Sequence, residues 1–559
     1  MLLSIFASSF ACAQNPQSIP SNVEVTRNGL IYSVSANETL SSISQKFTGQ
    51  VNHWRAIGES NHIGNDRTIP IGKKILIPSR LLTPVSAFAK IKNFFGKVVI
   101  QSSEGSNIEA ALGTLLKEGD TLMTLADGFI SLALEDGTQF TLPPNSTVSL
   151  KMLRATYIIN SPRTELFLQK GRVKSQVTPF VQPDSRFEVQ SPLAVSGVRG
   201  TVFRVNYDQQ RVLNEVIEGK VAVNSGVQAK ATKTGQLVTH GYGTVVENGR
   251  VGKPVALLAV PTMSDGYQTQ HRLPIQFALS HPSATSFSTV ISTDSAGANN
   301  IAEAFVKNKD GTATAKLENL EDGEYFVHYS AIDQAGLEGV PGTLRFRVEV
   351  RPFPPFLLSP AAKFQSNHLG AEVQVPMQWS QTAGAYGYRL QVASDQTFAS
   401  TVIDKTIEQD VAQTTVPLKV GSYYWRVATI IKNGPANKQG PFGDAKKLEL
   451  LPELPAPAAK IGEEDVHFTW SATPGQRFTF QISESNTFDK LLNDIETTQS
   501  EASIPAPQAG TYYARVRSID ADGFIGTFSP PQKFVIPDRW RTEYGGTWQS
   551  MDKPVGTGF

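Results

Sequence analysis

Cysteine is almost absent from this chain, because Cys12 is the only one among 559 residues. A chain with a single thiol cannot form an internal disulfide or a metal site built from several cysteines. Cys12 lies in the apolar start MLLSIFASSFACA, whose Ala11-Cys12-Ala13 ending fits the small-x-small pattern cut by signal peptidase. We therefore expect residues 1–13 to be a signal peptide and the protein to be exported, with the thiol removed by cleavage.

Because no Lys or Arg precedes the apolar run, either the true start lies upstream or the signal is short and atypical. Two further alternatives stay open for this N-terminus. The run could be an ordinary apolar N-terminus, or Cys12 could carry a lipid. Ser9-Phe10-Ala11 is a poor context for lipidation, so the signal peptide remains our expectation.

An excess of charge of one sign is also lacking. The 51 Lys and Arg residues against 50 Asp and Glu leave a net charge of +1, so the chain has no general attraction to polyanions and we expect no nucleic-acid partner.

Long apolar runs are missing as well. No stretch after the N-terminus approaches the roughly 20 apolar residues that span a bilayer, so we expect no transmembrane segment.

Motifs of catalysis and metal binding are scarce. The eight His residues form no H-E-x-x-H or H-x-H pair, and there is neither a G-x-S-x-G elbow nor a phosphate-binding Gly-rich loop. Asp520-x-Asp522-Gly523 is similar to the start of a calcium loop, but the later acidic ligands are missing and a hairpin turn fits better. We expect no enzymatic activity, no metal and no cofactor.

The length of the chain predicts about four domains, and its patterns predict a multidomain, mainly β protein. Residues 28–82 differ from the rest. Tyr32 and Val34 alternate as in a strand, and Leu40, Ile43 and Phe47 recur at helical spacing. A second helical stripe and the strand KILIP follow, so the segment predicts a compact βααβ unit.

This unit resembles a LysM domain. The matching positions are Tyr32, Val34, Thr39, Leu40, Ile43, Phe47, Trp54, Ile57, Asn61, Ile63, Ile71, Gly72, Ile75, Ile77 and Pro78. Asn37 stands where the family has Gly, Glu38 where it has Asp, and Ile75 where it has Leu.

The resemblance implies binding of glycans that contain N-acetylglucosamine, such as peptidoglycan or chitin, in a shallow groove between two loops. Carried onto this chain, the groove residues are Asn37, Glu38, Thr39 and Leu40 on one side and Asn61, His62 and Ile63 on the other. Polar groups there would bond the acetamido and hydroxyl groups, while Leu40 and Ile63 would pack on methyl groups and ring faces. Ile43, Phe47 and Trp54 are expected to be core instead.

Residues 91–256 predict an all-β domain, because strand-sized alternations are separated by turns such as Asp127-Gly128 and Asp136-Gly137. The stretch SPLAVSGVRGTVFRV, followed by VIEGKVAV, resembles the periplasmic FecR-type domain. Some relatives pass a signal from an outer-membrane receptor to a membrane-bound sigma-factor regulator. They carry a cytoplasmic helical region and a transmembrane helix ahead of this domain, and neither is expected here, so the resemblance extends to the module alone.

Arg199 lies in Gly197-Val198-Arg199-Gly200, between two of the predicted strands. This segment could be a protein-recognition loop with Arg199 as its charged contact. The competing interpretation is a bulge or tight turn whose glycines take positive φ, and this second interpretation is the stronger one.

The C-terminal third contains a repeat of about 90–100 residues, typical of β-sandwiches. The copies span residues 261–351, 353–451 and 452–537, and they resemble fibronectin type III or related immunoglobulin-like modules. Trp379 and Trp470 mark two copies, whereas Phe277 replaces Trp in the first, which matches less well. Pro-rich joints predict stiff linkers, and residues 538–559 predict a loose tail.

These resemblances together predict a non-catalytic protein of the bacterial periplasm or cell envelope. The LysM unit would bind peptidoglycan, and the other domains would present a surface to an envelope protein partner. A signalling component that acts through the FecR-like domain is the alternative, and a cell-wall hydrolase is a further, weaker one.

Overall fold

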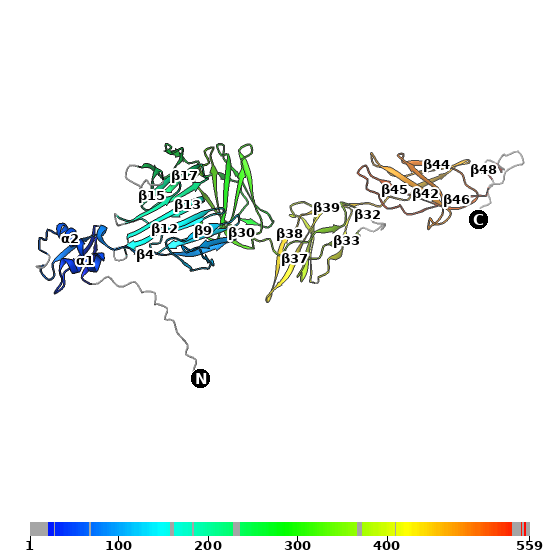
Figure 1. The fold of residues 1–559 in the computed structure, drawn as a ribbon. Coiled ribbons are helices and arrows are strands. Elements are labelled where there is room, and N and C mark those ends of the chain that lie inside the picture. Colours follow the sequence, from blue (N-terminus) through cyan, green and yellow to red (C-terminus); the bar gives the residue numbers. More distant parts are fainter. Residues whose placement is uncertain are drawn as a thin grey trace, which may run out of the picture. The chain divides into compact units, whose positions relative to one another are not determined.

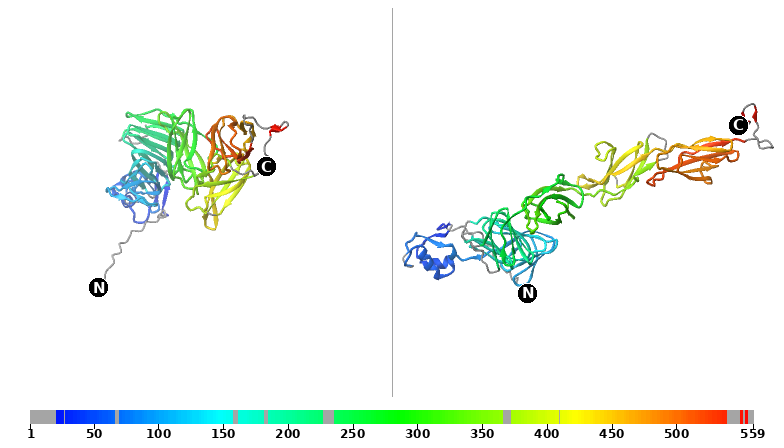
Figure 2. Two further views of the ribbon diagram at one scale, coloured as in Figure 1. Left: turned by 90° about the vertical axis from the view of Figure 1, so that its right-hand side faces the viewer. Right: turned by 90° about the horizontal axis from the view of Figure 1, so that it is seen from above.

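In the computed structural model, the described residues are 21–26, 28–65, 69–156, 161–180, 184–226, 235–365, 372–408, 410–538, 549–550 and 553–554. The predicted signal peptide, with Cys12, lies outside them. The chain divides into two compact units, residues 1–349 and 350–559. It is multidomain and mainly β, as predicted from the sequence (Figure 1). All helices of the described residues lie between Leu40 and Leu81, in the blue part of both views in Figure 2.

The N-terminal unit has the predicted strand–helix–helix–strand order with one more strand in front. The elements are β1 (Val23–Thr26), β2 (Gly29–Ser33), α1 (Leu40–Thr48), the 3-10 turn η1 (Val51–His53), α2 (Trp54–Ser60), β3 (Lys74–Pro78) and the 3-10 turn η2 (Ser79–Leu81). The three strands form one sheet in the order β1-β2-β3. Leu40, Ile43 and Phe47 are buried as their spacing predicts, and Trp54 packs against the same core while half-buried.

Helix α1 begins and ends where the sequence signals it. Thr39 has extended backbone angles, and its hydroxyl accepts the Ser42 N–H at 3.1 Å, while the Ser42 hydroxyl accepts the Thr39 N–H at 2.9 Å. These two bonds make a capping box. The helix ends at Gly49, which takes a φ of 67° that favours glycine. The cap fixes the backbone of the loop before α1.

The long β domain begins at Val85, slightly before the predicted residue 91. Its strands are β4 (Val85–Ser86), β5 (Ala89–Phe95), β6 (Val98–Gln101), β7 (Asn107–Ile108), β8 (Leu115–Leu116), β9 (Thr121–Thr124), β10 (Phe129–Leu134), β11 (Gln139–Leu142), β12 (Thr147–Thr156), β13 (Ser161–Gln176), β14 (Arg186–Gln190), β15 (Ala194–Val198), β16 (Val202–Tyr207), β17 (Arg211–Glu218), β18 (Lys220–Ser225), β19 (Gln236–Thr239), β20 (Tyr242–Glu247), β21 (Arg250–Val251) and β22 (Val255–Ala256). They form one 19-stranded hydrogen-bonded network.

Two features of this domain position the functional groups discussed below. Strand β13 pairs with β12 through its first part and with β16 through its second, so it belongs to both faces of the domain. Turns follow β9 and β10 at the two predicted Asp-Gly positions. A single large core of buried Val, Leu, Ile and Phe side chains lies between the faces.

Three β-sandwiches follow, each with two sheets. The first contains β23 (Thr262–Met263), β24 (Thr269–Gln270), β25 (Ile275–Ser280), β26 (Ser286–Ser292), β27 (Asn300–Lys307), β28 (Thr312–Leu317), β29 (Gly323–Ile332) and β30 (Gly342–Val348). The second contains β31 (Leu357–Ser359), β32 (Lys363–Gln365), β33 (Val373–Trp379), β34 (Gly387–Ala393), β35 (Thr401–Ile407), β36 (Gln413–Leu418), β37 (Gly421–Asn433), β38 (Ala436–Phe442) and β39 (Lys446–Leu451).

The third sandwich contains β40 (Ala458–Ile461), β41 (Asp465–Thr469), β42 (Arg477–Ser483), β43 (Leu491–Thr497), β44 (Glu501–Pro505), β45 (Gly510–Ile519) and β46 (Gln532–Ile536). Its sheets run β40-β41-β44 and β43-β42-β45-β46. Of the tail, the structure describes Asp538 and the short pair β47 (Gln549–Ser550) and β48 (Lys553–Pro554).

A tyrosine corner recurs in all three sandwiches and confirms the repeat. The hydroxyls of Tyr325, Tyr423 and Tyr512 each donate to a backbone carbonyl four residues upstream, at 3.1, 2.9 and 2.8 Å. This bond is a hallmark of immunoglobulin-like sandwiches. Trp379 and Trp470 are buried in the cores, as their position in the repeat predicts.

Candidate functional site

The loop before α1 is held by internal hydrogen bonds centred on Glu38. Its carboxylate accepts the Tyr32 hydroxyl at 2.7 Å, the Ser35 N–H at 2.9 Å and the Lys46 Nζ at 3.4 Å. Although partial burial opposes ionisation, these three donors hold the pKa of Glu38 below its usual value. Glu38 is therefore a charged side chain whose carboxylate is hydrogen-bonded within the LysM-like unit.

The neighbours of Glu38 differ in how much of their side chains they present. Asn37 is exposed and has a φ of 65°, as a turn requires. Thr39 is half-buried, and its hydroxyl caps α1. Leu40 is fully buried in the core, so its side chain supports the loop and is not exposed at the surface.

In the loop after α2, too, some side chains are exposed and others bond within the domain. The side-chain amide of Asn61 donates to the carbonyls of Ile57 and Leu76, at 2.8 and 2.6 Å, and accepts the Leu76 N–H at 2.6 Å. Asn61 thus joins α2 to β3. His62 is exposed with a φ of 54°, and Ile63 is half-buried against the core.

The two loops meet at Gly58, in the last turn of α2. A Cβ added to Gly58 would lie 3.0 Å from the Ile63 carbonyl oxygen and 3.3 Å from Leu40 Cδ1. Leu40 and Ile63, one from each side of the predicted groove, therefore both lie close to Gly58. Asn37 and His62 have exposed side chains and Ile63 a half-buried one, while Glu38, Leu40 and Asn61 use theirs within the domain.

Arg199 lies in a turn, exposed to solvent. Gly197 and Val198 are paired residues of β15, so the segment is strand followed by turn. Gly200 has a φ of 96°, and a Cβ there would lie 2.5 Å from Pro179 Cα. The glycine is required by this close approach, which supports the structural interpretation of the segment.

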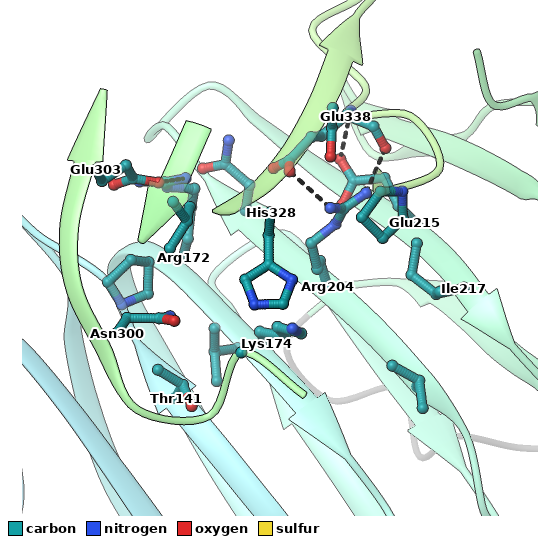
Figure 3. A pocket seen from close by; sticks show the side chains of 18 of the residues that line it. Thr141, Arg172, Lys174, Arg204, Glu215, Ile217, Asn300, Glu303, His328 and Glu338 are labelled. Carbon is teal, nitrogen blue, oxygen red and sulfur yellow. Dashed lines mark hydrogen bonds and ion pairs between the residues drawn. The ribbon is translucent and has the colours of Figure 1, made fainter. Parts of the chain in front are cut away.

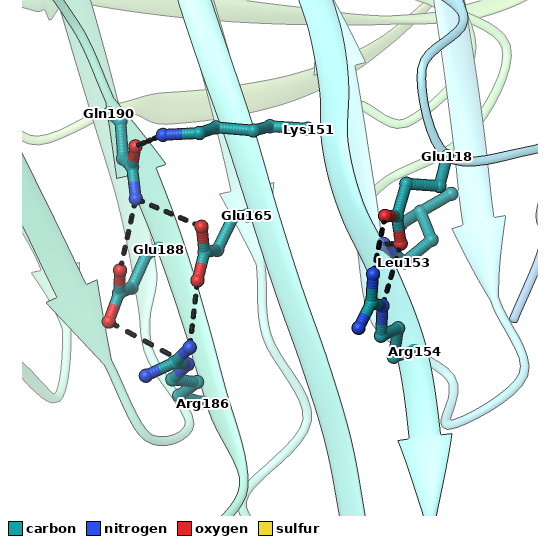
Figure 4. Close-up of polar contacts among 8 residues, drawn as sticks. All are labelled: Glu118, Lys151, Leu153, Arg154, Glu165, Arg186, Glu188 and Gln190. Carbon is teal, nitrogen blue, oxygen red and sulfur yellow. Dashed lines mark hydrogen bonds and ion pairs between the residues drawn. The ribbon is translucent and has the colours of Figure 1, made fainter. Parts of the chain in front are cut away.

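A polar network covers part of the long β domain where β12, β13 and β14 run side by side (Figure 4). Glu165 and Glu188 are parallel-strand neighbours, and both are buried. Gln190 Nε2 donates to both carboxylates at 3.2 and 3.3 Å, and Arg186 donates to Glu165 at 2.8 Å. Lys151 completes the network by donating to Gln190 at 2.7 Å.

Burial raises the pKa of Glu188, which lies beside the charge of Arg186. Both carboxylates have protein donors, so the network is arranged as an internally neutralised cluster. Sequence reasoning missed it, because the parallel pairing of β13 with β14 has no local signature.

A partly enclosed cavity of about 410 Å³ lies between the long β domain and the first sandwich (Figure 3). Arg172 donates to both oxygens of Glu303, at 2.9 and 2.6 Å. Arg204 donates to Glu338 at 2.7 Å and to the backbone carbonyls of Glu338 and Gly339. These bonds join two domains of the first compact unit.

Two further titratable groups line this cavity. Complete burial raises the pKa of Glu215 to about 7, with the charge of Arg204 opposing that rise. Burial, together with the charge of Lys174, lowers the pKa of His328 to about 4. In Figure 3 the imidazole of His328 lies over Lys174. None of the groups around this cavity was predicted from the sequence.

Family models identify two of the domains. A model described as LysM domain matches residues 32–78, and a model described as FecR protein matches residues 120–222. The chain carries a LysM domain and a FecR domain. The LysM match covers the N-terminal unit with its two loops, and the FecR match covers the centre of the long β domain, for which we use the name FecR domain below.

Comparison with whole proteins adds little. Two structures of a Parabacteroides distasonis protein assigned as an anti-sigma factor share 16% and 18% identity, with TM-scores of 0.20. The chain spans 59% of their length, over 24% of its own. The FN1–FN3 domains of chicken CNTN1 share 12% identity over 47% of this chain and 94% of that one, also with a TM-score of 0.20. Scores this low support no inference, and no curated protein matches the sequence.

The two domain types indicate the general role of the chain. A LysM domain indicates glycan binding, and a FecR domain is typical of extracytoplasmic proteins that take part in envelope signalling. Both are binding or signalling domains. Within the described ranges, every helix is too short or too polar to cross a bilayer.

Proposed function

We propose that this chain is a non-catalytic protein of the bacterial periplasm or cell envelope that binds peptidoglycan through its LysM domain. Its FecR domain and sandwiches would present surfaces to an envelope protein partner. The observation that carries the proposal is the approach of Leu40 and Ile63, one from each side of the predicted groove, to Gly58, with Asn37 and His62 exposed in the same two loops.

The side chains at this groove suit a glycan. The Asn37 amide both donates and accepts hydrogen bonds, and His62 adds a ring nitrogen to the opposite side. Ile63 offers an apolar surface for an acetamido methyl group or a ring face. Thr39 and Glu38 hold the first loop in place, and Asn61 holds the second, so both loops are ordered before a ligand arrives.

Co-sedimentation of the full chain with purified, protein-free peptidoglycan sacculi tests this proposal. Asn37 and His62 both have positive φ, so Asn37→Gly and His62→Gly remove the side chains without straining the backbone. Asn248→Gly is the matched control, because Asn248 has a φ of 51° and lies in the FecR domain. We expect the double variant Asn37→Gly/His62→Gly to lose at least about tenfold in affinity, the worth of one or two good hydrogen bonds.

The control should sediment like the wild type. If the wild-type chain stays in the supernatant, peptidoglycan is not its ligand. If the double variant sediments as well as the control, the groove residues are assigned wrongly even though the glycan binds. Soluble chitin oligosaccharides, added as competitors, should release the wild type from the sacculi.

The absence of catalysis is part of the proposal and has its own test. The buried carboxylates Glu165 and Glu188 share donors with each other, and Glu303 is paired with Arg172, so each is committed to a structural contact. Zymography of the full chain on labelled cell wall should show no clearing. Clearing that disappears in Glu165→Gln would instead establish a hydrolase.

Envelope signalling is a second candidate, favoured by the cavity between the FecR domain and the first sandwich. Buried charged groups at a domain boundary can respond to a ligand by changing how the domains are held together. Deletion of the gene should then alter transcription, and that effect should be reproduced by variants of the cavity. A transcriptome that is unchanged by deletion would exclude this role.

A further inference from the structure

The sequences of the three sandwiches can be aligned residue by residue through two shared features. In each, a register shift interrupts the pairing of two neighbouring strands, β26 with β27, β34 with β35 and β42 with β43. The shift lies at Ser292, Ala393 and Ser483, respectively. In each, a tyrosine corner starts the strand beside it. Counting three residues on from each tyrosine places His328 in the first sandwich where the others have Arg426 and Arg515.

The second and third sandwiches fill this position in the same way. Arg426 donates from Nε and Nη2 to Gln391 Oε1, at 3.0 and 2.8 Å, and its guanidinium lies 3.8 Å from the ring centre of Phe398. Arg515 bonds to Gln481 at 2.9 and 2.8 Å and lies 4.0 Å from Phe488. In both sandwiches an arginine guanidinium therefore lies between a glutamine and a phenylalanine ring and covers this face of the sheet.

The first sandwich has smaller residues at all three positions. Val290 replaces the glutamine two residues before the register shift, and Gly297 replaces the phenylalanine five residues after it. Gly297 has a φ of 66°, against 62° for Phe398 and 58° for Phe488, so the backbone is unchanged while the ring is missing. The sheet face is consequently hollowed, and Val290, Gly297 and His328 all line the cavity of about 410 Å³.

The loop of residues 294–299, which forms one wall of this cavity, is held firmly. Asp294 accepts the N–H groups of Ala296, Ala298 and Asn299 at 3.0, 3.1 and 2.6 Å. The Ala298 carbonyl in turn accepts the hydroxyl of Ser131 in the FecR domain. The cavity is therefore built from positioned groups of two domains, which is the usual place for a small-molecule site.

Among the described residues, one of the three cations that line the cavity makes no direct ion pair. Arg172 and Arg204 are paired with Glu303 and Glu338, but no carboxylate of the described residues lies within ion-pair distance of Lys174. Its Nζ donates to the Ala296 carbonyl at 3.2 Å. Burial and then the charge of Arg204 lower the pKa of Lys174, and the charges of Glu338 and Asp294 oppose this shift only in part. An ammonium that is partly desolvated and lacks an ion-pair partner gains from a bound anion.

We propose that this cavity binds a small organic monocarboxylate, whose carboxylate pairs with the ammonium of Lys174. A single negative charge fits best, because four carboxylates also line the cavity and would repel a second one: Glu215, Glu218, Glu303 and Glu338. The rest of the ligand is apolar, because the wall contains Val202, Ile217, Val290 and Ile332. The volume is sufficient for a molecule of this class.

Isothermal titration of the full chain with hexanoate tests the site. Hexan-1-ol has the same body without the charge, hexylammonium has the opposite charge, and inorganic phosphate is an anion without the apolar body. We expect hexanoate to bind and the other three to bind at least about tenfold more weakly. The site does not depend on the glycan groove, so peptidoglycan binding should be unaffected by saturating hexanoate.

Lys174→Met and Lys174→Arg provide the matched variants. Methionine keeps the aliphatic stem and removes a desolvated charge, so we expect it to fold, with a melting temperature no lower than that of the wild type. It should lose about tenfold to a hundredfold in affinity for hexanoate, whereas arginine should retain most of it. Lys405→Met, at an exposed lysine of the second sandwich, should change nothing.

Four results would overturn the proposal. Hexanoate could fail to bind the wild type, Lys174→Met could bind it equally well, hexylammonium could bind as tightly, or phosphate could bind in its place. The melting curve of each variant shows that the folded state is the one being titrated. Loss of peptidoglycan binding in the Asn37→Gly/His62→Gly chain would leave the hexanoate result unchanged.

Discussion

Arg172 of the FecR domain donates to both carboxylate oxygens of Glu303 in the first sandwich, at 2.9 and 2.6 Å. The Glu303 side chain is only 5% exposed. The guanidinium also lies 4.7 Å from the ring centre of Phe305, on the same strand as Glu303. A desolvated pair of this kind has little tolerance for the loss of one partner. It couples the folding of the two domains.

Glu303→Ala should therefore lower the free energy of unfolding of the first compact unit by about 2–4 kcal/mol, because Arg172 would remain partly buried without its carboxylate. Chemical denaturation followed by circular dichroism measures the change. Arg172→Met/Glu303→Leu should recover most of the loss, since neither charge is then left alone. Glu324→Ala is the control, because Glu324 pairs with Arg345 at the exposed surface of the same sandwich and should be nearly neutral. If Glu303→Ala and Glu324→Ala lowered the free energy of unfolding equally, burial of the Arg172–Glu303 pair would not explain its contribution.

His328 and Glu215 should give this unit opposite dependences on pH. The pKa of His328 is lowered to about 4 in the folded chain, so the unfolded chain binds the proton first and stability falls as pH drops from about 6.5 to 4. The pKa of Glu215 is raised to about 7, so the folded chain binds the proton first and stability falls as pH rises from about 4.5 to 7. Each contribution is on the order of 1–3 kcal/mol.

Melting the wild type, His328→Gln and Glu215→Gln between pH 4 and 7.5 separates the two contributions. Relative to the wild type, His328→Gln should gain stability as the pH falls, because the histidine penalty is gone. Glu215→Gln should gain stability as the pH rises, because the buried carboxylate no longer has to ionise. Parallel curves for all three proteins would show that neither group titrates as its surroundings require.

Within the LysM domain, stability and glycan contact should separate by residue. Asn61→Ala removes three hydrogen bonds to the backbone and leaves the Leu76 N–H and carbonyl without their side-chain partner. We expect a loss of about 2–3 kcal/mol in the local stability of the domain. Hydrogen exchange of residues 54–78 in the full chain measures it. Asn37→Gly and His62→Gly should leave this exchange unchanged while weakening binding to sacculi, and faster exchange in either would contradict the division.

The sequence predicts what is local in this molecule. The helical stripe of Leu40, Ile43 and Phe47 corresponds to a buried helix face, because a periodicity of 3.6 residues records which side of a helix meets the core. The cap at Thr39 and the turn at Asn37 are equally local, since one residue type is enough to favour each of them. The fold of the LysM domain follows from such signals.

The cavity could not be predicted in this way. Arg172 and Glu303 are 131 residues apart, and no periodicity connects two strands of different domains. One signal was present: comparison of the repeats shows His328 in GEYFVHYSAI where GSYYWRVATI has Arg426. The glycan residues show the converse limit. Asn61 belongs to the family motif, yet its side-chain amide is hydrogen-bonded to the backbone of Leu76. A matching residue type therefore does not by itself distinguish a ligand contact from a structural one.

The tyrosine corners allow a last prediction that compares the three sandwiches. Tyr423 and Tyr512 are largely buried, and each hydroxyl donates to one backbone carbonyl, of Lys419 and of Gln508. Tyr423→Phe and Tyr512→Phe keep the ring and remove only this bond, so the loss should be about 1–3 kcal/mol in the sandwich that carries the change. Tyr325 is more accessible than these two, and water can replace its partner, so Tyr325→Phe should cost less. Denaturation of each full-length variant, followed by hydrogen exchange at the altered corner, measures the three losses. Equal losses at all three would mean that accessibility of the hydroxyl does not govern the worth of the bond.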